Sequence, residues 1–131
     1  MNAQRKRLLI LGAGRGQIGL YKAAREMGVI SIAGTMPNNN PPCIPLAVCY
    51  MDILDPDEVE SKTADLRFDG VATCCLDRGL KALGRLCDKR SLPGYSEEVA
   101  ELCNDKSKMK LRFSKYGVNT AAFKQISSDE D

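Results

Sequence analysis

Short apolar runs alternate with amphipathic segments along most of the chain. Apolar runs bounded by glycine or turn-forming residues predict strands at residues 7–11, 29–33, 49–53 and 69–76. Apolar residues at helical spacing predict helices at residues 17–27 and 78–89, and Asp55 is expected to cap another helix that begins at Pro56. This alternation predicts parallel strands joined by helical crossovers.

The pattern continues to the end of the chain with shorter elements. Residues 92–94 are expected to hold a very short strand, and Ser96 is expected to cap a brief helix. A helix at residues 106–116 and a strand at residues 120–126 follow. We predict an α/β fold with a Rossmann-like, doubly wound, mostly parallel sheet of about four to five strands. We expect one domain at residues 1–103, and a C-terminal helix–strand stub at residues 104–131 that is the truncated start of a second domain.

Composition and charge exclude several classes of partner. The chain has 131 residues, of which 44% are hydrophobic, and its formal net charge is +2. Because lysine and arginine are interspersed with acids, neither nucleic acid nor a membrane surface is expected as a partner. The basic start precedes an apolar run that is too short for a secretory signal or a membrane span. We therefore expect a cytoplasmic protein.

The cysteines indicate neither a metal site nor a disulfide framework. The chain contains no histidine and no pair of cysteines separated by two residues, so a zinc site is not expected. Adjacent cysteines in a strand would point to opposite faces of the sheet, which disfavours a shared metal. We expect reduced thiols, mostly in the core. The cysteines are Cys43, Cys49, Cys74, Cys75, Cys87 and Cys103.

A glycine-rich turn lies between the first predicted strand and the first predicted helix. Its glycines, in the segment LGAGRGQIG, allow positive φ and close backbone approach, and the helix start offers free N–H groups to an anion. Three interpretations stay open: a small anionic substrate, a dinucleotide, or a purely structural turn. The dinucleotide interpretation lacks the acid expected after the second strand, where Gly34-Thr35-Met36 stands. The candidate substrate-binding residues of this turn are Gly14, Arg15, Gly16 and Gln17.

Asp77 and Lys106 are further candidates at element boundaries. Asp77 follows the fourth predicted strand and either caps the next helix or helps to bind a substrate. Lys106 begins a helix, where its positive charge meets the positive end of the helix dipole, and Lys110 lies on the same face. This placement is favourable if an anion binds there, although two solvated lysines on an exposed face are an alternative interpretation.

Segments spread over nearly the whole chain resemble the amino-terminal part of ATP-grasp enzymes. They include LLILGAGRGQIGLYKAAREMG, DGVATCCLDRGLKALGRLC and LPGYSEEVAELCNDKSKMK. The sequence is most similar to the carbamoyl-phosphate synthase-like and biotin carboxylase-like branch. The resemblance implies a Rossmann-like pre-ATP-grasp domain that ends at about Cys103, followed by the start of the ATP-grasp domain. It also implies that Lys106 approaches the phosphates of ATP.

The resemblance implies an enzyme that activates a carboxylate with ATP as an acylphosphate, which an amine or another nucleophile then captures. ATP and Mg²⁺ would act in the full-length parent, and the family's metal-holding carboxylates would lie beyond this chain. Losing these groups would remove phosphoryl transfer. The chain also departs from the family near the second-domain strand, where Asn119 and Ala121 stand in a region that usually contains proline.

These observations give one main hypothesis of function and two alternatives. The chain is expected to be the N-terminal fragment of a carboxylate-activating ligase, with no catalytic or metal-binding residues of its own and no activity alone. Its partners would be a small carboxylate or phosphorylated substrate and the rest of the ATP-grasp chain. One alternative is a nucleotide- or dinucleotide-binding Rossmann module without catalysis. The other is a scaffold or homodimerisation domain that uses its terminal helix.

Overall fold

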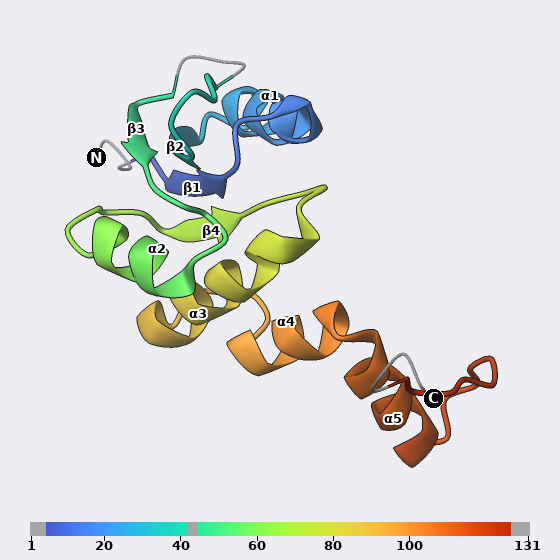
Figure 1. The fold of residues 1–131 in the computed structure, drawn as a ribbon. Coiled ribbons are helices and arrows are strands. Elements are labelled where there is room, and N and C mark those ends of the chain that lie inside the picture. The colour runs from blue at the N-terminus through green and yellow to red at the C-terminus, as the bar shows by residue number, and fades with distance from the viewer. Residues whose placement is uncertain (1–4, 42–44, 127–131) are drawn as a thin grey trace.

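A computed structural model of the chain describes residues 5–41 and 45–126, and Figure 1 shows the fold. Helices follow β1, β3 and β4, whereas β2 leads to β3 without a helix between them, and two further helices follow at the end of the chain. The strands are β1 (Arg7–Leu11), β2 (Ile30–Thr35), β3 (Ala47–Tyr50) and β4 (Gly70–Ala72). The α-helices are α1 (Ile18–Glu26), α2 (Pro56–Thr63), α3 (Leu80–Arg90), α4 (Glu97–Asn104) and α5 (Lys106–Lys115), and two short 3-10 helices are η1 (Arg15–Gln17) and η2 (Asp77–Gly79).

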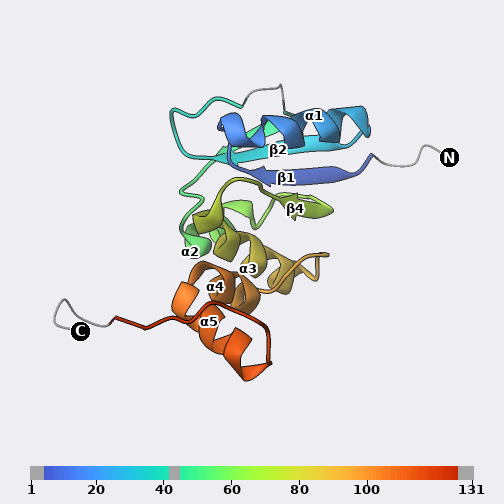
Figure 2. The ribbon, with the colours of Figure 1, turned by 90° about the vertical axis from the view of Figure 1, so that its right-hand side faces the viewer.

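The strands form one parallel sheet in the order β3-β2-β1-β4. Helix α1 covers one face of the sheet, and α2 and α3 cover the other (Figures 1 and 2). The carboxyl ends of all strands therefore meet at one edge, and the glycine turn that follows β1 lies there. The predicted α/β class and doubly wound parallel sheet are confirmed.

Alternate residues of the central strand β1 hold the two layers together. Leu9 and Leu11 are fully buried and belong to the large core beneath α2 and α3. Ile10 points to the opposite face, where it packs with Tyr21 of α1 and Ala33 of β2. A strand in the middle of a parallel sheet is buried on both faces, which explains its continuous apolar sequence.

Helices α2, α3 and α4 are held by a helix cap and by the ion pairs of one arginine. Asp55 caps α2 as predicted, because its carboxylate accepts hydrogen bonds from the backbone N–H groups of Asp57 and Glu58. Arg85 of α3 binds Asp57 and forms a 2.7 Å ion pair with Glu97 of α4. These contacts tie three successive helices to one another.

Arg90 binds the C-terminal end of α2. Its guanidinium donates hydrogen bonds to the carbonyl oxygens of Thr63, Ala64 and Leu66, and it stacks 4.3 Å from the centroid of the Phe68 ring. The last carbonyls of a helix have no partners within the helix, so a cation at that end both satisfies them and complements the helix dipole. Arg90 thereby joins the end of α3 to the end of α2.

Several predicted strands differ from the structure. Strand β4 ends at Ala72, and the hydroxyl of the next residue, Thr73, donates a 2.7 Å hydrogen bond to the carbonyl oxygen of Leu11, at the end of the paired strand. Residues 92–94 form no strand; they wrap the end of α3, where Ser91 has a left-handed backbone and the N–H of Leu92 donates to Cys87. Strand β3 spans Ala47–Tyr50, so it overlaps the predicted strand at residues 49–53 but begins and ends earlier.

The expected C-terminal strand is absent from the described residues. Residues 120–126 are exposed or half-buried and belong to no strand. Lys110 of α5 holds this segment by hydrogen bonds to Thr120 and Ala121. The segment beyond Asn104 therefore consists of one helix and an irregular tail in the part that the structure describes. Helix α5 has no buried residue and lies beyond α4, away from the sheet (Figure 1). None of the helices in residues 5–41 and 45–126 is long and apolar enough to cross a membrane.

Candidate functional site

The glycine turn after β1 depends on close packing at Gly12. This residue has a φ of 103°, in a region that residues with a side chain rarely adopt. A Cβ atom added there would lie 2.9 Å from the side chain of Gln17. The backbone N–H of Gly12 also donates a 2.8 Å hydrogen bond to Gly34 of β2. Glycine is therefore required to turn the chain at the carboxyl edge of the sheet.

Gln17 holds this turn in place from inside. Its side chain is only 5% exposed, and its Oε1 accepts a 3.0 Å hydrogen bond from the backbone N–H of Gly14. Its Nε2 donates to the carbonyl oxygen of Cys74, in the segment after β4. Gln17 therefore fixes the turn against the neighbouring strand end, and a direct contact with a ligand stays a prediction.

Gly14, Arg15 and Gly16 form the exposed surface of the turn. Gly14 occupies the N-cap position of η1, and Arg15 begins that short helix. No ion pair of Arg15 is found in the part of the chain that the structure describes, so its guanidinium is available to solvent. This surface therefore offers a cation on a rigid support, which suits a carboxylate or a phosphate.

Asp77 lies in the segment that follows β4, but it is not the helix cap. Leu76 occupies the N-cap position of η2, and Asp77 is the first residue of that helix. The capping interpretation is therefore wrong, because the chain turns one residue earlier than the sequence indicates. The carboxylate of Asp77 and the side chain of Arg78 are both exposed. Arg78 escaped the sequence analysis, although it directly follows a candidate at the carboxyl edge.

Lys106 begins α5, as predicted, and the structure supplies a local reason for its position. Asp105 caps the helix by accepting a 3.0 Å hydrogen bond from the backbone N–H of Lys108. The ammonium group of Lys106 donates a 3.2 Å hydrogen bond to Cys103, whose carbonyl lies at the negative end of α4. The negative C-terminal end of α4 therefore offsets the unfavourable position of the Lys106 charge at the N-terminus of α5. Lys106 remains exposed and keeps further donors for an anion.

The structure brings these sequence-distant candidates toward one edge of the sheet. Gln17 connects the glycine turn to Cys74, and the side chain of Asn104 donates a 2.8 Å hydrogen bond to the carbonyl oxygen of Asp77. Lys106 lies just beyond Asn104 in the chain. The candidate site is thus built from the turn after β1, the segment after β4 and the junction of α4 with α5.

Two further features of this edge were not predicted. An open groove of about 620 Å³ runs between the loop after β2 and helix α2, and Tyr50, Glu58 and Lys62 are among its lining residues. The polar loop NNN beyond β2 was the available signal, since loops at this edge commonly bind ligands. Thr35 is fully buried at the end of β2, and its hydroxyl has no hydrogen-bond partner within the described residues.

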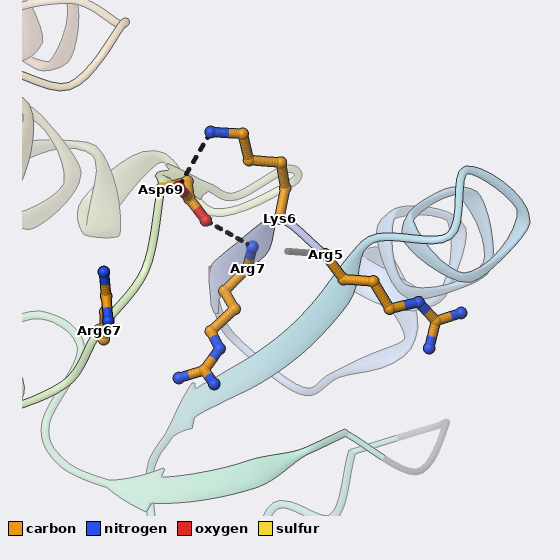
Figure 3. A pocket seen from close by; sticks show the side chains of 5 residues that line it. All are labelled: Arg5, Lys6, Arg7, Arg67 and Asp69. Carbon is orange, nitrogen blue, oxygen red and sulfur yellow. Dashed lines mark hydrogen bonds and ion pairs between the residues drawn. The ribbon is translucent and has the colours of Figure 1, made fainter. Parts of the chain in front are cut away.

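The opposite, amino edge of the sheet carries a small basic cleft of about 90 Å³, shown in Figure 3. Asp69 binds the backbone N–H of Arg7 at 2.8 Å and the ammonium group of Lys6 at 3.1 Å, and these two bonds lower the pKa of its carboxyl group. The side chains of Arg5 and Arg7 point away from each other (Figure 3). Because its cations do not converge, this cleft is a weaker candidate than the carboxyl edge.

Comparison with solved structures identifies the fold and its relatives. The chain is 56% identical to phosphoribosylglycinamide synthetase from Anaerococcus prevotii, with a TM-score of 0.87 over 97% of this chain and 33% of that chain. An L-amino acid ligase from Bacillus licheniformis shares 20% identity and a TM-score of 0.75, over 91% of this chain and 32% of that one. No model of a known protein family and no curated protein matches the chain.

A biotin carboxylase domain belongs to the same group of matches. The biotin carboxylase domain of a thermophilic 2-oxoglutarate carboxylase shares 19% identity and a TM-score of 0.57, over 90% of this chain and 29% of that one. The chain thus spans about a third of the length of the enzymes that it matches. These enzymes have the ATP-grasp architecture, and the predicted resemblance is confirmed. The chain belongs to the ATP-grasp superfamily and corresponds to the N-terminal part of its enzymes.

Proposed function

We propose that the chain is the substrate-side part of an ATP-dependent ligase that activates a carboxylate as an acylphosphate for attack by an amine or another nucleophile. The observation that carries this proposal is the 56% identity, over 97% of the chain, with a phosphoribosylglycinamide synthetase. The names of the matched enzymes, a synthetase and an L-amino acid ligase, support bond-forming chemistry. We also propose that this ligase is a cytoplasmic enzyme.

In this proposal the exposed glycine turn binds the anionic group of the substrate. Arg15 supplies the charge, while Gly14 and Gly16 allow the substrate to approach the backbone. Gln17 keeps the turn rigid through its bond to Cys74, and the exposed carboxylate of Asp77 faces the amine or orders the loop. A rigid turn lowers the entropy cost of binding, since fewer groups must be ordered by the ligand.

Lys106 is the group of this chain that fits a nucleotide phosphate. It is exposed, and its ammonium group is already held near the N-terminus of α5 by Cys103. ATP would supply the phosphoryl group that activates the carboxylate. Within residues 5–41 and 45–126, no three His, Cys, Asp or Glu side chains lie together in a way that could hold a metal ion. We therefore propose that Mg²⁺ is held by other parts of the parent enzyme.

The proposed domain boundary lies at about Asn104. Asp105 ends α4 and caps α5, so one residue with extended backbone separates the two helices. Helix α5 buries no residue of its own, which suits a helix that packs against further ATP-grasp structure. We propose that the rest of an ATP-grasp chain is the partner of this surface and that the 131-residue chain does not turn over ATP alone.

Calorimetric titration of the 131-residue chain with ATP and Mg²⁺, together with an assay of phosphate release, tests this function. We expect neither saturable heat nor phosphate release, and turnover by the isolated chain would refute the proposal. Titration with ribose 5-phosphate tests the turn: Arg15→Ala should weaken binding, whereas Arg25→Ala, at the far end of α1, should not. Saturable binding of NAD(H) or NADP(H) would instead favour the dinucleotide-binding module.

A further inference from the structure

Two adjacent thiol groups lie beside the glycine turn. Strand β4 ends at Ala72, and Cys75 has a φ of 54°, in the left-handed region. This conformation breaks the strand alternation that would send neighbouring side chains to opposite faces, and the side chains of Cys74 and Cys75 both lie against Gly16 of the turn. The expectation of opposite faces applied only to a strand, and Cys74 and Cys75 lie beyond the end of β4, because the strand is shorter than the apolar run.

Both cysteines contact the same residue of the turn. The thiol of Cys74 donates a 3.0 Å hydrogen bond to the carbonyl oxygen of Gly16. A Cβ atom added to Gly16 would lie 2.8 Å from Cβ of Cys75, so the backbone of Gly16 passes directly against that side chain. A change in the geometry of the thiol pair must therefore reach the surface that Gly14, Arg15 and Gly16 present.

We propose that Cys74 and Cys75 are a vicinal dithiol that a low-molecular-weight disulfide oxidises to a Cys74–Cys75 disulfide, and that this modification shifts the glycine turn. The thiolate of Cys75 attacks one sulfur of the reagent and releases one thiol. The thiolate of Cys74 then attacks the sulfur of Cys75 and releases the second thiol. Two protein thiols lose two electrons and two protons, and the reagent is reduced to two thiols.

The environment of the pair explains why Cys75 reacts first. Cys75 is exposed, whereas Cys74 is half-buried and has a raised pKa, chiefly because burial disfavours its thiolate and also because Cys75 lies beside it. Cys74 therefore stays a thiol, bonded to Gly16, until the reagent is attached to its neighbour. Formation of the disulfide consumes that S–H donor, so the bond to Gly16 is lost.

The other described cysteines provide internal comparisons. Burial raises the pKa of the Cys49 and Cys87 thiols, which slows their attack on a disulfide. Cys103 is exposed, as Cys75 is, but lies on α4. Only Cys87 is buried, so the expectation that most of the cysteines lie in the core is wrong within the described residues, and Cys43 lies outside them. Cys103→Ser is therefore a matched control.

The test is oxidation of the full chain by oxidised glutathione, followed by alkylation, unfolding and peptide mass spectrometry. Of the six cysteines, we expect two to lose their free thiols without retaining glutathione, with the disulfide inside the peptide that contains residues 74 and 75. Cys103→Ser should leave this product unchanged, whereas Cys74→Ser should retain glutathione on Cys75. Glutathione retained on Cys75 of the unsubstituted chain, a disulfide to any other cysteine, or no thiol loss would overturn the proposal.

The effect on the turn has a readout of its own. In a spectrum of backbone amide resonances, oxidation should shift the signals of Gly14 and Gly16 and leave that of Gly28, after α1, in place. Unchanged signals of Gly14 and Gly16 in the oxidised chain would refute the coupling. Neither measurement uses ATP or a ligase substrate, so the result is independent of the proposed ligase function.

Discussion

The side-chain amide of Asn104 donates a 2.8 Å hydrogen bond to the carbonyl oxygen of Asp77. This bond joins the last residue of α4 to the first residue of η2, although the two are far apart in sequence. This bond attaches the junction of α4 and α5, which carries Lys106, to the segment after β4. The proposed nucleotide contact and the proposed substrate contact are therefore linked by a single side chain.

Asn104→Ala removes this link and should loosen the segment at Asp77. The loss of one exposed hydrogen bond is expected to lower the free energy of unfolding by at most about 1 kcal/mol. The local effect should be larger than the global one, so the amide of Gly79, which donates to Leu76, should exchange its hydrogen faster. Asn119→Ala is the control, because Asn119 is exposed in the irregular tail. Equal exchange at Gly79 in both variants would contradict the link.

Gly16 and Gly19 should respond in opposite directions to alanine. A Cβ atom at Gly16 would lie 2.8 Å from Cβ of Cys75, so the turn or the segment after β4 must move, and we expect a loss of about 1–3 kcal/mol. At Gly19, inside α1, nothing lies within 4 Å of an added Cβ. Alanine there should stabilise the helix by about 0.5–1 kcal/mol.

Urea denaturation of the two glycine variants measures both effects with the same type of substitution. If Gly16→Ala is as stable as the unsubstituted chain, the close contact with Cys75 does not exist in solution. Gly16→Ala should also weaken ribose 5-phosphate binding, since it alters the surface next to Arg15. Gly19→Ala should leave that binding unchanged.

The sequence predicted the layered fold well because its signals are local. The run 7–11, the Asp55 cap and the helix spacing of residues 80–87 each depend on neighbours within a few residues. The strand ends were harder to predict, since they depend on partners elsewhere. Strand β4 stops where Thr73 bonds to Leu11, and residues 92–94 follow the end of α3 because Ser91 turns the chain. No local pattern encodes either contact.

The candidate site shows the same limit. The glycine turn was recognised from the spacing of its glycines, and Lys106 from its position at the start of a helix. The residues that hold them in place were not recognised. Gln17 was predicted to contact substrate, yet its amide is engaged with Gly14 and Cys74. The left-handed backbone of Cys75 and the hydrogen bond from Asn104 to Asp77 depend on contacts at the assembled edge of the sheet. They could therefore not be predicted from the order of residues along the chain.

Arg90 should contribute more to stability than its neighbour Lys89. Arg90→Met removes the donors to the last carbonyls of α2 and the cation above Phe68, and we expect a loss of about 1.5–3 kcal/mol. Lys89→Ala removes only an exposed 3.7 Å ion pair with Glu60 and should cost less than about 0.5 kcal/mol. Urea denaturation midpoints measured at pH 7 compare the stability losses of the two variants.

Arg90→Lys separates charge from geometry. Lysine keeps the positive charge, but it lacks the planar fork that reaches several carbonyls at once. We expect a stability between that of the unsubstituted chain and that of Arg90→Met. A lysine variant as stable as the unsubstituted chain would show that charge alone accounts for the effect.

Glu97 should make the helical layer sensitive to acid. Its pKa lies below the ordinary value of 4.5, chiefly because Arg85 donates hydrogen bonds to its carboxylate. A lowered pKa in the folded state means that the pair stabilises the fold fully above pH 4.5. This contribution is lost as the pH falls through that value and then through the lower value of the folded state.

Glu97→Gln isolates this contribution, because the amide keeps the shape of the side chain and does not titrate in this range. The pair is partly exposed, so we expect the variant to be less stable at pH 7 by about 0.5–1.5 kcal/mol, with the difference shrinking as the pH falls below 4.5. Glu98→Gln is the control, since the side chain of Glu98 is 77% exposed and lies 3.5 Å from Arg112. Because Glu97 joins α4 to α3 through Arg85, a variant that retains the full pH dependence would show that this junction is held by apolar packing rather than by the ion pair.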